Sequence, residues 1–190
     1  MLRGRRGFAS STRYTIEYRP GDYETWKYVA PIQRSAWTSK AFESGTWGGE
    51  IRPEFTPRSG EIVAQEHWCS SGFANTDLDL LLKKHGIHKL IVMGLIAHTC
   101  VEATVRFAAE LGYDVTLVKD ATADYSDEHM HAGLDVNLPG YAGAIVTANE
   151  VVESISSSRL YNIPLFFPTR NAAPRSRPPA LRVLPETSTR

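Results

Sequence analysis

The chain has 190 residues, 42% of them hydrophobic, which is enough for one domain with a substantial core. Residues 1–15 carry four Arg and no acid, and residues 169–190 carry five Arg and one Glu. Since the whole chain is neutral and each end has a surplus of four positive charges, the middle carries a net −8. This charge argues against nucleic-acid binding. No apolar run approaches the roughly 20 residues of a membrane span, and two Cys exclude a disulfide framework.

The two ends differ in composition from the middle. Residues 1–13 are rich in Arg and Ser and lack acids, as in a mitochondrial presequence, but hold few large apolar residues. We therefore expect a flexible basic start and a cytoplasmic protein, with a mitochondrial location as the alternative. Residues 158–190 are rich in Pro, Ser and Arg and are expected to be disordered. The predicted domain is 14–157.

Strand and helix patterns alternate along this domain. The predicted strands are Tyr14–Tyr18, Glu61–Ala64, Leu90–Met93, Asp114–Val118 and Ala144–Val146. The predicted helices are Asp77–His85, Cys100–Leu111, Asp127–Leu138 and Ala148–Ser156. Gly86 and Gly112 are helix stop signals, and Thr147 with Glu150 has capping-box spacing. This alternation predicts an α/β fold with a mostly parallel sheet, which binds ligands beyond the carboxyl ends of its strands.

The segment LIVMGLIAHTCVEATVR (90–106) is the most informative part of the chain. An apolar strand turns at Gly94, and a helix is predicted to start at Cys100, with Thr99 and Glu102 spaced as a capping box. A thiol in the first turn of a helix faces unpaired N–H groups and the positive end of the dipole. This environment makes Cys100 a candidate nucleophile. A buried thiol closing a strand–helix joint is the alternative.

Residues 94–124, GLIAHTCVEATVRFAAELGYDVTLVKDATAD, resemble the nucleophile segment of the isochorismatase-like cysteine hydrolases, in their amidohydrolase branch. SGFANTDLDLLLKKHGI (71–87) is similar to the family's preceding helix, and GTWGGE (45–50) to its substrate-side loop. The resemblance covers about residues 18 to 155. It implies a Rossmann-like three-layer α/β/α sandwich. It also implies cleavage of small amides, ureido compounds or an enol ether through a Cys, a Lys and an Asp.

Two of these three catalytic groups have no match in the chain. The resemblance places the Asp at the end of a first strand, and the chain begins where the second would be, so we expect that strand to be missing. Asp22 and Asp120 are poor substitutes, in a turn and at a strand end. Where the Lys should precede Ser-Gly-Phe, the chain has Glu66 and His67, which are candidates for acid–base work or ordinary polar residues.

The resemblance also implies an oxyanion hole made by the amides of Ile96 and Cys100, with a cis bond between Leu95 and Ile96. Trp47, Trp68 and Tyr125 are candidate walls of a substrate pocket, although aromatic residues more often pack in a core.

No cofactor is expected. The nicotinamidase branch binds a metal through an Asp and a His pair, for which the sequence shows no matching cluster. His129 and His131, two apart on a helix, point in different directions, so no metal site is expected. Arg106 is expected to pair with an acid near its helix, and Cys69 to be a buried thiol.

The sequence therefore predicts a cysteine hydrolase that cleaves a C–N bond of a small amide or ureido compound through Cys100. A non-catalytic or truncated member that keeps the fold and a pocket is the alternative, because the Asp and the Lys are missing. The expected partner is a small-molecule substrate, without nucleic acid or membrane. The sequence is also compatible with a homo-oligomer.

Overall fold

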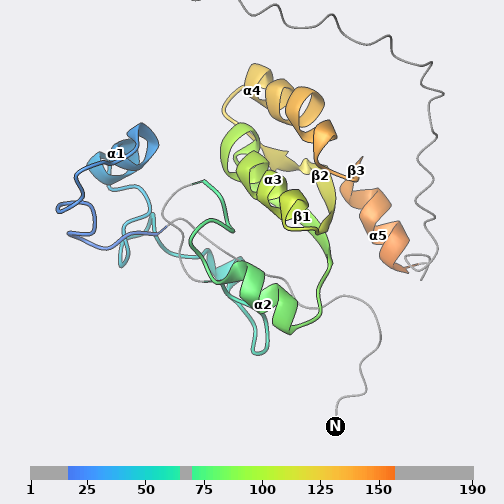
Figure 1. The fold of residues 1–190 in the computed structure, drawn as a ribbon, viewed down its shortest axis with the longest axis horizontal. Coiled ribbons are helices and arrows are strands. Elements are labelled where there is room, and N and C mark those ends of the chain that lie inside the picture. Colours follow the sequence, from blue (N-terminus) through green and yellow to red (C-terminus); the bar gives the residue numbers. More distant parts are fainter. Residues whose placement is uncertain (1–16, 65–69, 157–190) are drawn as a thin grey trace, which may run out of the picture. The chain divides into compact units, whose positions relative to one another are not determined.

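The computed structural model describes residues 17–64 and 70–156 (Figure 1). Contacts divide the chain into two compact units, Met1–Glu153 and Ser154–Arg190, and every described element lies in the first apart from the end of the last helix. None of the described helices combines the length and the apolar character needed to cross a bilayer. The predicted flexible start (1–13) and disordered tail (158–190) lie outside the described residues.

A parallel sheet of three strands, flanked by helices, organises the described chain (Figure 1). Its strands, in the order β1-β2-β3, are Lys89–Leu95, Asp114–Ala123 and Ala144–Val146. β1 pairs with β2 from Lys89↔Asp114 to Val92↔Leu117, and the pairing resumes at Gly94↔Thr122. This shift in register bulges β2 and carries it five residues beyond the predicted end at Val118. Within the described ranges, β1 pairs with β2 alone.

The helices largely follow the sequence prediction. They are α1 (Pro31–Thr38), η1 (Pro53–Phe55), α2 (Leu78–Lys84), η2 (Ala97–Val101), α3 (Glu102–Glu110), α4 (Asp127–His131), η3 (Ala132–Asn137), η4 (Leu138–Gly140) and α5 (Ala148–Ser156). Gly86 and Gly112 adopt positive φ angles of 67° and 90° just past α2 and α3, as their role as stop signals requires. The capping box before α5 is confirmed, because Thr147 and Glu150 each bond the other's backbone N–H.

One predicted strand, Glu61–Ala64, is not a strand in the structure, and another, Tyr14–Tyr18, lies mostly outside the described residues. The described end of Tyr14–Tyr18 makes an isolated bridge between Tyr18 and Glu43. Glu61–Ala64 contains a single bridge residue, Val63. A short apolar run becomes a strand only where a partner pairs with its backbone over several residues, and sequence periodicity does not reveal that partner.

The helix α1 was not predicted, although its start signals are present in the sequence. Pro31 occupies the first helical position, and the Gln33 side chain accepts the Ala30 N–H at 3.0 Å. Near it, the rings of Tyr18 and Tyr23 are almost fully buried and their centroids lie 5.5 Å apart. Aromatic packing gives residues 17–64 their own small apolar cluster.

The main core lies between β2 and the helices that precede and follow it. Val115 and Leu117 from β2 and Val105 from α3 are at most 1% exposed. The remaining members of this core cluster are Ala64, Phe73, Leu78, Leu82, Ala97, Val101, Ala108, Tyr113, Leu134 and Leu138. The segment that precedes β1 thus packs on the same core as η2, α3 and η3, and the core fixes the position of the turn that carries Cys100.

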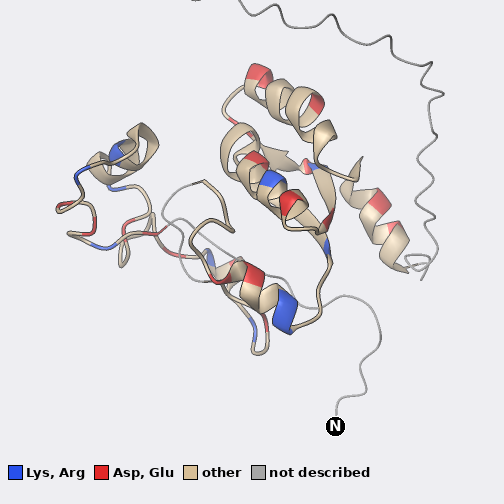
Figure 2. Cartoon of the chain, in the orientation of Figure 1, with Lys and Arg blue, Asp and Glu red and all other residues tan. Residues whose placement is uncertain are grey.

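Charge is distributed unevenly over the described elements. Figure 2 shows Lys and Arg together with Asp and Glu on α2 and α3, but only Asp and Glu on α4 and α5. The acidic surplus predicted for the middle of the chain is therefore concentrated toward its C-terminal helices.

Candidate active site

Cys100 lies in the helical turn that directly follows the carboxyl end of β1, and its side chain is half-buried. The turn η2 is wide and begins at Ala97, three residues before the predicted start, because the Ile96 carbonyl accepts the N–H groups of Thr99 and Val101. The Thr99 hydroxyl contacts the Cys100 sulfur at 3.6 Å. The thiol thus lies in the first turn of a continuous helix, as predicted.

The predicted capping box between Thr99 and Glu102 is wrong. No side chain caps the start of η2 or of α3. The Glu102 carboxylate contacts one residue of its own helix and one of η3, and not the backbone at Thr99. Arg106 donates to it at 2.9 Å, and the Asn137 amide donates to its other oxygen at 3.0 Å. A charged guanidinium one turn away outcompetes a backbone N–H for this carboxylate.

Arg106 is held in place on both sides, which confirms its expected pairing with an acid. Its guanidinium forms an ion pair with Glu102 at 2.7 Å and donates to the Tyr141 hydroxyl at 2.6 Å. The hydrogen bond from Arg106 to Glu102 is the main reason why the pKa of this guanidinium is raised further. The network fixes α3 against the segment after η4 and leaves the charge of Arg106 neutralised.

Thr104 connects the Cys100 turn to the segment Ser70–Phe73. Its side chain is buried, donates to the Cys100 carbonyl at 2.7 Å and accepts the Gly72 N–H at 3.0 Å. In the same segment, the Ser71 hydroxyl accepts the N–H groups of Phe73 and Ala74. Buried polar groups that satisfy one another in this way fix backbone positions closely.

The peptide bond between Leu95 and Ile96 is cis, as the sequence resemblance implied. This bond stands at the junction of β1 and η2, four residues before Cys100. An oxyanion hole made by the amides of Ile96 and Cys100 remains a prediction.

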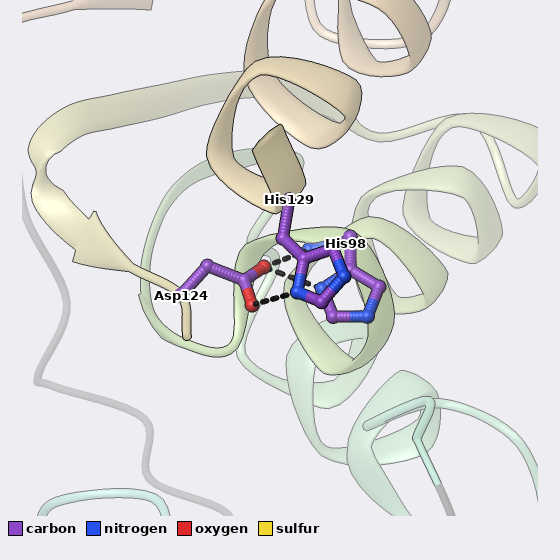
Figure 3. A group of neighbouring side chains, drawn as sticks. All are labelled: His98, Asp124 and His129. Carbon is purple, nitrogen blue, oxygen red and sulfur yellow. Dashed lines mark hydrogen bonds and ion pairs between the residues drawn. The ribbon is translucent and has the colours of Figure 1, made fainter. Parts of the chain in front are cut away.

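His98, Asp124 and His129 form a compact group beside this turn (Figure 3). The Asp124 side chain is fully buried. One oxygen lies 2.6 Å from His98 Nδ1 and the other 3.7 Å from His129 Nδ1. The two imidazole rings lie close together, with centroids 4.3 Å apart and their planes tilted by 31°. Sequence reasoning missed this group because its members come from three separate elements.

Asp124 is held by backbone as well as by rings. Burial alone would raise the pKa of its carboxyl, but hydrogen bonds from the His98 backbone, the His98 ring and the Tyr125 backbone outweigh burial and lower the pKa. Asp124 is therefore an anion in the folded protein at neutral pH.

The other predicted site residues are scattered. Glu66, His67 and Trp68 lie outside the described residues, so their assignments remain predictions. Trp47 and Tyr125 are 92% and 81% exposed, and their roles as pocket walls are likewise untested.

The two carboxylates weighed as substitutes for the missing Asp have structural partners. Asp120 accepts the Ala148 N–H at the start of α5, at 2.7 Å, and Asp22 accepts the Arg19 N–H within its turn, at 2.6 Å. Asp120 also lies inside β2 and not at its end. Each carboxylate thus accepts a backbone N–H, Asp22 within its own turn and Asp120 from the start of α5.

Comparison with known proteins shows which family carries this arrangement. The model of the isochorismatase domain matches residues 12–151, so the chain belongs to the isochorismatase family. A solved isochorismatase-like hydrolase from Alkaliphilus metalliredigens superimposes with a TM-score of 0.63 at 28% identity, over 80% of this chain and 76% of that one. The α/β fold and the predicted family are thereby confirmed.

Two curated relatives bear on activity. The secreted isochorismatase effector Isc1 of Verticillium dahliae is 42% identical over 83 residues, which are 44% of this chain and 43% of Isc1. The ureidoacrylate amidohydrolase RutB of Rhizobium rhizogenes is 29% identical over 126 residues, 66% of this chain and 51% of RutB. The chain therefore spans about half the length of the curated relatives it matches.

Proposed function

We propose that this protein is a cysteine hydrolase that cleaves a C–N bond in a small amide or ureido compound. The observation that carries the proposal is the position of Cys100, half-buried in the first helical turn beyond a parallel strand, in an isochorismatase domain. Parallel α/β sheets bind ligands at this edge. The similarity to ureidoacrylate amidohydrolase RutB supports a C–N bond as the one cleaved.

In the proposed reaction, the Cys100 thiolate attacks the carbonyl carbon and a C–S bond forms. The electron pair of the carbonyl moves to its oxygen, where the amides of Ile96 and Cys100 are proposed to donate to it. Collapse of this intermediate breaks the C–N bond, and the nitrogen leaves as an amine after receiving a proton. Water then attacks the thioester, which releases the acid and regenerates the thiol.

This scheme requires a group that gives a proton to the leaving nitrogen and activates the water. Glu66 and His67 are the proposed candidates, since they precede the segment Ser70–Phe73, whose Gly72 is linked through Thr104 to the Cys100 carbonyl. A small-molecule amide or ureido compound is the proposed partner.

Replacement of the nucleophile tests the proposal. Cys100→Ala should lower turnover of ureidoacrylate and of simple N-carbamoyl compounds by about 10³–10⁶-fold, as is common when a nucleophile is lost. Ammonia release and substrate loss measure the effect. The matched control is Cys69→Ala, which changes the second thiol of the chain and should keep the wild-type rate.

Two results would contradict the proposal. Turnover that survives in Cys100→Ala would remove this residue as the nucleophile. A folded wild-type protein that turns over none of these compounds and is not acylated by them would favour the non-catalytic alternative.

A further inference from the structure

We propose that His98, Asp124 and His129 form a binding site for one divalent transition-metal ion, with Zn²⁺ as the best match. The site is separate from the thiol chemistry proposed for Cys100 and does not depend on it. In the described residues these three side chains bring two imidazoles and one carboxylate together, with one ligand atom from each within 4.8 Å of the others.

The chemistry of the three ligands selects the class of ion. Two imidazole nitrogens with one carboxylate oxygen suit Zn²⁺ and neighbouring first-row metals, while Ca²⁺ and Mg²⁺ prefer oxygen ligands throughout. Three protein ligands leave a fourth position for water or another small molecule. The carboxylate also supplies negative charge close to a dication.

The distances fit an ion with small adjustments. Ligands about 2.0–2.1 Å from a tetrahedral ion lie about 3.3 Å from each other. One oxygen of Asp124 is 2.6 Å from His98 Nδ1 and the other oxygen is 3.7 Å from His129 Nδ1, so the first pair is slightly too close and the second slightly too far. The short pair is a hydrogen bond. The ion takes the place of its proton, and the neutral His98 ring keeps one proton on Nε2.

Backbone hydrogen bonds orient the Asp124 carboxylate and leave each of its oxygens free to bind an ion as well. One oxygen of Asp124 accepts the His98 N–H at 2.8 Å, and the other accepts the Tyr125 N–H at 2.7 Å. Each oxygen has a second lone pair, and Figure 3 shows both oxygens beside the two imidazole rings. Backbone donors of this kind fix the ligand before the ion arrives.

The elements that supply the ligands also leave a path for the ion. His98 comes from η2, Asp124 follows β2, and His129 comes from α4, whose first turn is capped by the Ser126 hydroxyl. Asp124 is fully buried, whereas the His129 side chain is 49% exposed. His129 is therefore the most exposed of the three ligands, and the ion is proposed to enter on its side.

Metal binding itself provides the test. Protein freed of metal with a chelator is titrated with Zn²⁺ by calorimetry and with Co²⁺ by visible absorption. We expect one equivalent of each, and a Co²⁺ spectrum of four-coordinate nitrogen and oxygen ligation without a thiolate charge-transfer band. His129→Asn and Asp124→Asn should weaken Zn²⁺ binding by at least about 10–100-fold.

The matched control is His131→Asn, on the same helix, where the imidazole pairs with the exposed Asp135 at 2.9 Å and not with the site. It should bind Zn²⁺ like the wild type, and so should Cys100→Ser. Since His129 is partly exposed, His129→Asn should remain folded, and circular dichroism checks this.

The proposal is overturned if the wild type binds no equivalent of Zn²⁺, or if His129→Asn and His131→Asn bind it equally. A thiolate band in the Co²⁺ spectrum would assign the ion to Cys100 and would also overturn it. Loss of amide turnover in Cys100→Ala bears only on the proposed hydrolase activity.

Discussion

Among single residues, Thr104 fixes the position of the proposed nucleophile Cys100 and has no part in the proposed chemistry itself. Its hydroxyl uses one donor and one acceptor direction, on the Cys100 carbonyl and the Gly72 N–H, and its methyl group is buried with it. Threonine fits this buried position because its hydroxyl makes both hydrogen bonds while its methyl group is removed from water.

We predict that Thr104→Val destabilises the protein by about 1–3 kcal/mol, because the buried Gly72 N–H loses its acceptor. The control Thr104→Ser keeps the hydroxyl and loses one methyl group, which costs about 0.8 kcal/mol. Urea unfolding of the three proteins measures both values. A Val variant that is no less stable than the Ser variant would show that the hydroxyl has no structural role.

At the scale of the element, Gly133 allows two wide helical turns to meet. A Cβ added at Gly133 in η3 would lie 3.2 Å from the backbone of Ala97 and of His98 in η2. Backbone atoms yield less easily than flexible side chains do, so the close approach of η3 to η2 favours glycine here. The contact also brings the chain that carries His129 close to the turn that carries Cys100.

Gly133→Ala should therefore be destabilising, by about 1–3 kcal/mol, in spite of the helix propensity that alanine adds. Gly140→Ala is the matched control, since a Cβ there meets nothing within 4 Å. That variant should be neutral or slightly more stable. Thermal and urea unfolding measure the stability of both variants. Equal stabilities of Gly133→Ala and Gly140→Ala would contradict the close contact.

At the scale of the whole molecule, the ring of Tyr113 connects elements that are distant in sequence. Its hydroxyl donates to the Asp79 carboxylate of α2 at 2.9 Å, and its ring packs on Phe73 with centroids 5.5 Å apart. Burial, and then the bond to the charged Asp79, raise the pKa of Tyr113 to about 12. The same carboxylate is held ionised, with a lowered pKa, mainly by Lys83.

The raised pKa of Tyr113 makes stability depend on alkaline pH. In the unfolded chain this phenol loses its proton near pH 10, while in the folded protein it keeps the proton until about pH 12. The contribution of Tyr113 to the free energy of unfolding is complete below pH 10. It declines by up to about 2–3 kcal/mol as the pH rises from 10 to about 12.

Urea unfolding at pH 9 and pH 11.5 measures this decline, with Tyr113→Phe as the control. Phe cannot ionise, so the variant should lose less stability between the two pH values than the wild type does. Identical losses would show that Tyr113 does not titrate differently in the two states.

The features that sequence spacing predicts correctly are those that depend on residues close together in the chain. The apolar runs of β1 and β3, the glycine stops after α2 and α3, and the capping box of α5 all arise within a few residues, so spacing alone reveals them. Cys100 was found in the same way, from a strand followed by a helix start.

The contacts between side chains from different elements became visible only in the folded structure. Glu102 bonds Arg106 and Asn137 and not the helix start, and His129 faces Asp124 and His98, from two other elements, and not its neighbour His131. Glu102 and Arg106 have the i,i+4 spacing of a helix pair, whereas the contacts of Glu102 with Asn137 and of His129 with Asp124 and His98 depend on how the elements pack. No spacing along the chain encodes that packing.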